Sequence, residues 1–398
     1  MVDQIGHTAR GDGGRDRRGV SIAVDAMGGD HGPTEIVPGA LDHARAHPED
    51  RVLLVGDEAT IRSVAGTLPP NIEIVHASEV VGMDEHPAKA LREKKDSTII
   101  IATDLVKRGR ADALVTAGHT GAGMAAAVLR LGRLPGVDRP ALAVQMTTDG
   151  GPVVLLDIGA NPDSTPENLA QYARMGAIFA DRVLGVADPA VALLSIGEEK
   201  GKGDARIQRA TELIDETNMR FVGNVEGKDI VKHMADVIVC DAVLGNVVIK
   251  FFEGLSGYIF DLFRAEFRGS LRGRLAYLLL KPGVGRIRGA FDYERAGGSP
   301  LLGVRGTVII THGRARRRMI GYGIAVAATM ARTRVPELIG QAFAAEAGRT
   351  PAPDTDEGAT DAGADTTDTG DDAAATAATA AADALDPSPQ PAPLESAP

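Results

Sequence analysis

Glycine-rich turns that carry acids, histidines and lysines recur at the ends of apolar runs in this sequence. The first, GGDHGP at 28–33, places Asp30 and His31 directly after Gly28 and Gly29. Glycines let backbone N–H groups approach a ligand closely, and a helix that begins at such a turn favours an anion at its N-terminus. Without a ligand, the same turn would be a strand-to-helix connection in which Asp30 caps the helix. This stretch alone supports both interpretations.

Four further turns repeat the pattern in GHTGAG, DIGANPDS, GEEKGKG and LGNVVIK. Their candidate ligand-binding residues are Thr120, Gly121, Asn161, Lys202, Asn246 and Lys250. A helix cap or an exposed loop is the plainer alternative for each turn. Because ligands bind outside the carboxyl ends of strands in open α/β sheets, five such turns together indicate one site for an anionic ligand. Their spacing matches neither the dinucleotide-binding fingerprint nor the P-loop, which disfavours a nucleotide.

These turns connect short apolar runs with segments of helix length. Continuous apolar runs spaced by helices predict a largely parallel sheet covered on both faces. The predicted fold is a three-layer α/β/α, Rossmann-like domain over residues 20–340 with a closing helix at 316–334. The expected strands are 21–27, 51–56, 71–77, 112–118, 141–146, 152–160, 190–197, 220–227, 236–242 and two within 301–313.

The two ends of the chain differ in composition from this domain. Residues 1–19 lack the apolar core of a signal peptide, so we expect a disordered N-terminal extension. Residues 349–398 hold eleven acids and one base of a chain whose formal net charge is −11, so the rest is nearly neutral. This tail has too few large apolar residues to offset the entropy of ordering, and we predict that it is disordered.

Deleting residues 349–398 is therefore expected to leave the melting temperature and the activity within error of the full chain. Thermal unfolding and a turnover assay check this. A marked loss of either would show that the tail docks on the domain.

Cysteine content and hydropathy bear on the compartment. The one cysteine, Cys240, cannot form an internal disulfide, and no segment has the uncharged length expected of a transmembrane helix. The sequence therefore favours a cytoplasmic protein. The sequence contains neither a zinc-protease motif nor a cysteine-rich site, so we expect no metal and no cofactor. We expect no nucleic-acid partner either.

Residues 251–288 are both apolar and basic. Large apolar residues recur every four positions, which drifts around a helix, and Gly269 and Gly273 suggest a break into the two helices of a protruding hairpin. A core or dimer-interface helix pair with a solvated arginine face explains the pattern as well as membrane contact does. The candidate contacts with an anionic membrane or an acidic partner are Arg268, Arg272, Arg274, Leu275 and Leu278.

Six words, in this order, resemble the phosphate acyltransferase (PlsX) family of bacterial phospholipid synthesis. They are IAVDAMGGDHGP, AGHTGA, LLDIGAN, FVGNVEGKDI, CDAVLGNVVIK and GGSPLLGVRGTVIITHG, between Ile22 and Gly313. The resemblance implies a fold related to phosphotransacetylases and to isocitrate and isopropylmalate dehydrogenases. It implies acyl transfer from acyl carrier protein to inorganic phosphate by a homodimer that associates peripherally with the membrane. The acyl phosphate would then pass to a membrane acyltransferase.

The resemblance also implies roles for the candidate residues. Phosphate is itself the nucleophile, so the reaction needs no Ser-His-Asp triad. Lys202 matches a family lysine and is the expected electrostatic partner of phosphate or of the oxyanion. Asp30 or His31 is the candidate proton acceptor. Hydrogen bonds are expected from Gly28, Gly29, Thr120, Gly121, Asn161, Asn246 and Lys250. Three positions depart from the family words, namely His119 for Asn, Leu244 for Thr and Arg314 for Ser.

Two other functions remain open. A phosphotransacetylase acting on a coenzyme A thioester shares the chemistry but would not need the hairpin at 251–288. A non-catalytic membrane scaffold would use the hairpin but not five glycine-rich turns. A decarboxylating dehydrogenase is disfavoured because the sequence shows neither its metal-binding carboxylate cluster nor an adenosine site.

Overall fold

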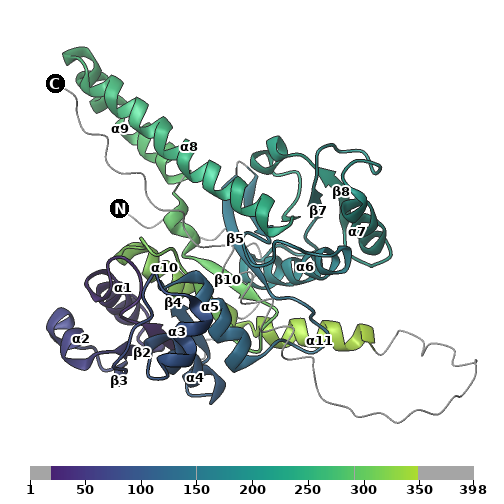
Figure 1. The fold of residues 1–398 in the computed structure, drawn as a ribbon. Helices are drawn as coiled ribbons and strands as arrows, with labels where there is room; N and C mark the ends of the chain where they lie inside the picture. Colours follow the sequence, from purple (N-terminus) through teal and green to yellow (C-terminus); the bar gives the residue numbers. More distant parts are fainter. Residues whose placement is uncertain (1–18, 149, 291, 348–398) are drawn as a thin grey trace, which may run out of the picture.

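The computed structural model describes residues 19–148, 150–290 and 292–347, so the predictions for residues 1–18 and 349–398 lie outside the described residues. All the predicted strands form, and they make one eleven-stranded sheet with the order β3-β2-β1-β4-β11-β10-β5-β6-β9-β7-β8 (Figure 1). Their bounds are β1 (Ser21–Asp25), β2 (Arg51–Gly56), β3 (Ile72–His76), β4 (Ala113–Thr116), β5 (Ala141–Thr148), β6 (Gly151–Leu156), β7 (Val191–Leu194), β8 (Phe221–Val225), β9 (Val237–Val239), β10 (Ser299–Leu302) and β11 (Thr307–Ile310).

Helices cover both faces of this sheet, which confirms the predicted three-layer arrangement. One face carries α1 (Pro33–Ala46), α2 (Glu58–Ala65), α6 (Pro166–Phe179), η2 (Ala180–Leu184), α7 (Ala205–Asp215), α10 (Arg317–Arg332) and α11 (Val335–Ala347). The other face carries α3 (Pro87–Glu93), α4 (Thr98–Lys107), α5 (Thr120–Ala126), η1 (Ala127–Leu131) and η3 (Gly227–Lys232). The short η4 (Tyr293–Ala296) precedes β10.

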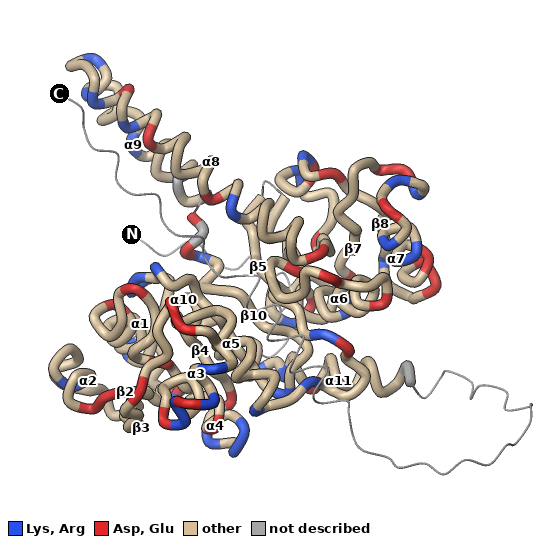
Figure 2. The backbone as a smooth tube through the Cα atoms, in the orientation of Figure 1, with Lys and Arg blue, Asp and Glu red and all other residues tan. Residues whose placement is uncertain are grey.

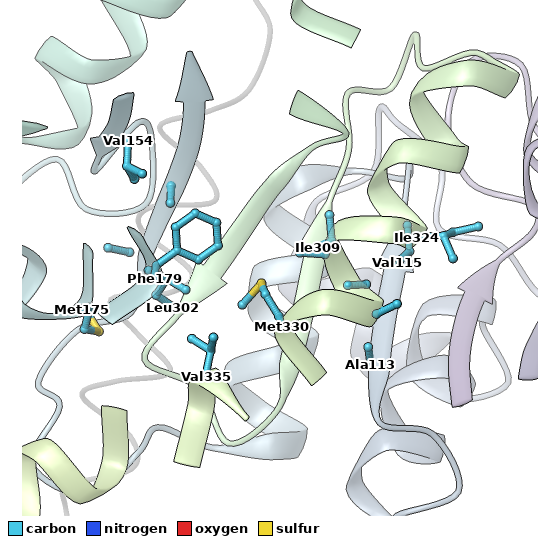
Figure 3. Close-up of a cluster of buried hydrophobic side chains, with 14 of the residues drawn as sticks. Ala113, Val115, Val154, Met175, Phe179, Leu302, Ile309, Ile324, Met330 and Val335 are labelled. Atoms are coloured by element: carbon cyan, nitrogen blue, oxygen red, sulfur yellow. The ribbon is translucent and has the colours of Figure 1, made fainter. Parts of the chain in front are cut away.

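A single buried cluster runs along one face of the whole sheet. It joins Val115 of β4 and Val154 of β6 to Phe179 of α6 and Ile324 of α10 (Figure 3). Neighbouring strand residues such as Leu114 point to the opposite face and belong to a second cluster. Burial on both faces explains why the strands read as continuous apolar runs.

The sheet is not parallel throughout. β1, β2, β3, β4 and β11 pair in parallel, and so do β6, β9, β7 and β8. Between these two sets, β10 pairs antiparallel with β11 and with β5, and β5 pairs antiparallel with β6. The three reversals leave the two parallel sets running in opposite directions. The single sheet edge expected for the five glycine-rich turns is therefore divided in two.

The predicted hairpin consists of α8 (Ala242–Arg268) and α9 (Leu271–Ala290), and it projects away from the body of the molecule (Figure 1). The helices part at Gly269, as expected. The rings of Phe267 and Tyr277, 5.4 Å apart between centroids, connect them. The first helix is longer than predicted because it starts at Ala242, soon after β9, and continues unbroken into the hairpin.

By length and composition, α8 could also cross a membrane, which corrects the expectation that no segment could. A single helix of this kind is weak evidence for a span. Near its start, Lys250 lies 3.2 Å from His312, and Glu253 lies 2.8 Å from Arg314, so this part of the helix is held against the turn between β11 and α10. We therefore treat α8 as a helix of the folded domain with an exposed apolar surface.

Gly245 lies where α8 crosses the turn after β6. A Cβ atom there would lie 2.0 Å from the carbonyl oxygen of Asp157, so the backbone must move to accept one. We expect Gly245→Ala to lower the free energy of unfolding by about 1–3 kcal/mol, as overpacking typically does. Urea unfolding measures the change.

The matched control is Gly254→Ala in the same helix. An added Cβ at Gly254 meets nothing within 4 Å. Alanine there should be neutral or stabilising by about 0.5–1 kcal/mol, because glycine is unfavourable inside a helix. Equal stability of the two variants would contradict the close approach at Gly245.

Candidate functional site

The turns after β1, β4 and β11 pack against one another. A Cβ on Gly28 would lie 2.8 Å from the backbone nitrogen of Gly118. Gly29 has φ +79°, and a Cβ there would lie 2.8 Å from the carbonyl oxygen of Gly313. The backbone N–H of Asp30 donates to that same oxygen over 2.8 Å. We call this assembly the first turn group, which consists of residues 28–31, 118–121 and 312–314.

A buried carboxylate organises the first turn group from beneath. Asp25 Oδ1 accepts hydrogen bonds from the backbone N–H groups of Met27 and Gly28, each over 3.2 Å, and Oδ2 accepts from Thr116 Oγ1 over 2.8 Å. Thr116 Oγ1 in turn accepts from the N–H of Gly118. Burial raises the pKa of Asp25, against the lowering effect of these hydrogen bonds. Asp25 thereby fixes two of the three turns relative to each other.

Internal hydrogen bonds decide which backbone donors remain for a ligand. The N–H of Gly28 is directed to the buried carboxylate, and that of Gly121 donates to His119 Nδ1 over 3.1 Å. Within the described ranges, the N–H groups of Gly29 and Thr120 and the Thr120 hydroxyl donate to no other group. Gly29 and Thr120 are thus the predicted donors that remain available, whereas Gly28 and Gly121 would have to share their hydrogen bonds.

Two departures from the family words leave the turn geometry intact. His119 is the N-cap of α5, and its Nδ1 accepts the hydrogen bond that an asparagine side-chain oxygen could accept. Leu244 is exposed, and its backbone N–H donates to the Asp241 carboxylate that caps α8, over 2.8 Å. That capping bond is made by the backbone and needs no particular side chain at position 244.

Asp30 and His31 lie at the rim of the first turn group. The N-cap of α1 is Gly32, and no side chain caps this helix, so the alternative in which Asp30 is only a cap is wrong. The Asp30 side chain is exposed and His31 is half-buried. Their assignment as proton acceptors stays a prediction.

Lys250 of α8 joins the first turn group through a cluster of charged residues. Its Nζ lies 3.2 Å from His312 Nε2 and 3.8 Å from Glu253 Oε2, and Arg314 donates to the same carboxylate oxygen over 2.8 Å. Burial, together with the positive charges of Lys250 and Arg314, lowers the pKa of His312 to about 4. The imidazole is therefore neutral near pH 7, and two cations with one carboxylate leave the cluster positive.

A second buried carboxylate organises the turn after β6. Asp157 accepts hydrogen bonds from the backbone N–H groups of Leu142, Gly159, Ala160 and Asn161 and from the Asn161 side chain. Burial raises its pKa to about 6. Asn161 Nδ2 also donates to the carbonyl oxygen of Pro140 over 2.7 Å, so its amide serves this turn internally. With the turns after β7 and β9 it forms the second turn group, which consists of residues 157–164, 195–204 and 240–246.

Lys202 lies in the exposed loop after β7. A Cβ on Gly197 would lie 2.8 Å from Lys202 Cγ, so the alkyl stem crosses over this glycine. The neighbouring Lys200 pairs with Asp215 over 2.7 Å, whereas the Lys202 ammonium pairs with none of the described residues. Of the two loop lysines, Lys202 is therefore the one available to an anionic ligand.

Two buried side-chain oxygen atoms lie beside this loop, and their residues were not singled out from the sequence. Ser195 Oγ and Asn224 Oδ1 have no hydrogen-bond partner among the described residues. Asn224 Nδ2 donates to the Glu199 carbonyl oxygen over 3.2 Å, so this side chain also supports the loop. Ser195 directly follows β7, whereas Asn224 lies within β8, so no glycine-rich turn marks either residue in the sequence.

The start of α8 connects the two turn groups. The N–H of Ala242 donates to the Asn161 carbonyl oxygen over 3.4 Å, and Lys250 reaches His312 of the first group. Asn246 lies between these contacts, half-buried, and its side chain makes no hydrogen bond within the part of the chain that the structure describes. The five predicted turns thus form two groups joined by α8.

Two clusters of possible metal ligands also occur. They are His47 with Glu49 and Asp50, and Glu198 with Glu226 and Asp229. Each already contacts a cation of the protein, because Arg332 pairs with Asp50 and Lys228 pairs with Glu226. We therefore assign no metal to either cluster.

Comparison with known proteins identifies the family. The family described as "Fatty acid synthesis protein" matches residues 20–338. A phosphate acyltransferase from Desulfitobacterium hafniense (strain Y51) is 48% identical over 309 residues, which cover 77% of this chain and 92% of that protein. The phosphate acyltransferase of Brevibacillus brevis is 43% identical over 324 residues, which cover 81% and 97%.

Solved structures share the fold. A phosphotransacetylase from Streptococcus pyogenes has a TM-score of 0.54 at 18% identity and covers 81% of this chain and 97% of its own. The EutD phosphotransacetylase from Staphylococcus aureus has a TM-score of 0.51 at 16% identity, with 80% and 96% covered. These likenesses confirm the predicted relation to the phosphotransacetylase fold, while the sequence matches settle the family. The chain therefore belongs to the fatty acid synthesis protein family, together with these phosphate acyltransferases, and it is an acyltransferase.

Proposed function

We propose that the protein transfers a fatty acyl group from acyl carrier protein to inorganic phosphate. The observation that supports this most strongly is the first turn group, where the free donors of Gly29 and Thr120 lie on adjoining turns beside the positive cluster of Lys250 and Arg314. Backbone N–H groups together with cations suit a phosphate dianion. The acyl phosphate product would supply the acylation of glycerol 3-phosphate in phospholipid synthesis.

In the proposed reaction, a phosphate oxygen attacks the thioester carbonyl carbon and forms a tetrahedral intermediate. The C–S bond then breaks, and the proton carried by hydrogen phosphate ends on the departing thiolate, so the products are acyl phosphate and free carrier thiol. Asp30 or His31 is placed at the rim to relay that proton. Holding both reactants in line supplies much of the acceleration.

Lys202 is proposed to stabilise the negative charge of phosphate or of the oxyanion in this intermediate. Its ammonium is unpaired among the described residues, and its loop belongs to the second turn group. A charge placed where negative charge develops acts most strongly once water is excluded. The two turn groups would then bind the reactants from two sides.

The outer end of the hairpin is proposed to contact an anionic membrane. Leu275 and Leu278 are 62% and 67% exposed, which rules out the core-helix alternative within the described chain. Basic residues lie at this end of the hairpin (Figure 2), and Arg268, Arg272 and Arg274 are exposed there. Apolar side chains flanked by arginines are typical of a membrane-surface helix. The protein would then be cytoplasmic, bound peripherally, and able to pass its product to a membrane acyltransferase.

A homodimer is proposed to use a different part of α8. Near the base of the hairpin, Val243, Val247 and Phe251 expose a stripe at helical spacing. A second copy of the chain could cover this stripe without covering the outer end. Sedimentation equilibrium of the whole protein tests the dimer.

The acyl donor is tested by offering the same acyl group on acyl carrier protein and on coenzyme A, with phosphate present, and following thiol release. We expect faster turnover with the carrier protein, because its acidic surface suits the basic hairpin. Turnover with coenzyme A alone would establish the phosphotransacetylase alternative. Turnover with neither donor would favour the scaffold.

A further inference from the structure

A cluster of charged residues connects the base of α8 to the turn between β11 and α10. This contact was not predicted from the sequence. Glu253 Oε2 lies 2.8 Å from an Arg314 guanidinium nitrogen and 3.8 Å from Lys250 Nζ. Lys250 Nζ lies 3.2 Å from His312 Nε2, and the N–H of Arg314 donates to His312 Nδ1 over 3.4 Å. The Glu253 side chain is largely buried, whereas the two cations are about half exposed.

This cluster adjoins the donors assigned to phosphate. Gly313, between His312 and Arg314, accepts the hydrogen bond of Asp30 and would lie 2.8 Å from a Cβ on Gly29. A displacement of the 312–314 turn would therefore move the Gly29 donor. The phosphate acyltransferase family commonly has serine where this chain has Arg314. This chain therefore carries one more positive charge at this turn than the family pattern would give.

We propose that Glu253 and Arg314 are positioning residues for phosphate. Their ion pair fixes the 312–314 turn against α8. The Lys250 ammonium and the Gly29 N–H can then bind the same phosphate group. The inference rests on the proposed function.

A positioning role and a simple net-charge effect predict opposite changes in the KM for phosphate when Glu253 is replaced by glutamine. Glu253→Gln removes a negative charge beside the proposed phosphate site, which by electrostatics alone would lower the KM for phosphate. If Glu253 positions Lys250 and Arg314, the same substitution raises the KM, because Arg314 loses its charge-assisted hydrogen-bond partner and Lys250 loses its ion-pair partner. A rise in KM is thus a signature that neither net charge nor a purely structural role explains.

The experiment measures KM for phosphate and kcat in wild type, Glu253→Gln, Arg314→Ala and the double variant. We expect each single variant to raise the KM for phosphate about tenfold, with kcat changed less than about twofold, and the double variant to be little worse than either, as for residues acting as one unit. Arg314→Lys should recover much of the loss. Asp261→Asn is the control, because Asp261 pairs with Arg264 on the same helix outside the cluster, over 2.7 Å, and its KM should match wild type.

A KM for phosphate that falls or stays unchanged in Glu253→Gln would overturn the proposal. A rise in the KM for the thioester instead would assign the cluster to the phosphodiester of the carrier's pantetheine arm and would also overturn it. A second readout needs no turnover: inorganic phosphate should raise the melting temperature of wild type more than that of Glu253→Gln at the same concentration. If wild type forms no acyl phosphate, the proposed function fails, and this shift still tests whether the cluster positions phosphate.

Discussion

Replacing Lys202 with alanine should lower kcat by about two to three orders of magnitude, the usual loss when a preorganised electrostatic donor is removed. The lysine is exposed and unpaired among the described residues, so the variant should unfold at nearly the same temperature as wild type. Steady-state kinetics with saturating phosphate and thioester measure the loss. Unfolding by heat checks that the fold is unchanged.

Lys200→Ala is the matched control for this prediction. Lys200 lies in the same loop, is also exposed, and pairs with Asp215. Its removal should leave kcat within about twofold of wild type, as expected for an exposed ion pair. Near-wild-type turnover of Lys202→Ala, or equal losses in both variants, would remove Lys202 from the site.

Replacing both Leu275 and Leu278 with glutamate should abolish sedimentation with anionic vesicles. Burying each leucine in the acyl region contributes about 1.5–3 kcal/mol, so the pair accounts for more than roughly a hundredfold in membrane affinity. The introduced acids also repel the vesicle surface. The kcat on saturating soluble acyl carrier protein thioester should be unchanged, because this end of the hairpin projects away from both turn groups (Figure 1).

The control substitution is Leu129→Glu, at a leucine that is exposed outside the hairpin. It should bind vesicles like wild type. Arg272→Glu with Arg274→Glu should weaken vesicle binding and can also raise the KM for acyl carrier protein, if that acidic protein uses the same face. Leucine variants that remain dimeric and vesicle-bound would show that the hairpin is not the anchor. Variants that fall to monomers would show instead that it is the dimer interface.

The central strands could be predicted from sequence because they are buried on both faces, whereas the edge strands β3 and β8 are only partly buried. Runs such as RVLLVG and PVVLLDIGA are almost wholly apolar at their centres; β2 coincides with the first run, and β6 overlaps the first half of the second. The direction of the strands could not be predicted in the same way. It depends on three antiparallel pairings. β5 with β6 and β10 with β11 join strands that are adjacent in sequence, whereas β10 with β5 joins strands far apart in the chain, and no local pattern records that last pairing.

The turns that form the candidate site could be predicted from the sequence, but the contacts between distant residues could not. Glycines at 28 and 29 follow from local backbone geometry, which a short stretch of sequence records, whereas His119 as the cap of α5 was not predicted. The contacts of Glu253 with Arg314 and of Lys250 with His312 join residues about sixty positions apart, so spacing carries no trace of them. The continuity of α8 was not predicted for a related reason. Residues 242–250 belong to a glycine-containing turn pattern and residues 251–288 to an apolar and basic helical pattern, so the two ranges were interpreted separately.

The most direct test of phosphate as the acyl acceptor is the fate of the acyl group when phosphate is replaced by sulfate at equal ionic strength. Purified protein is incubated with acyl carrier protein thioester, and both free thiol and hydroxylamine-trapped acyl phosphate are measured. We expect equal amounts of thiol and trapped acyl phosphate with phosphate, and neither product with sulfate. Thiol release at the same rate in sulfate, with free fatty acid as the product, would make the protein a thioesterase and contradict the account.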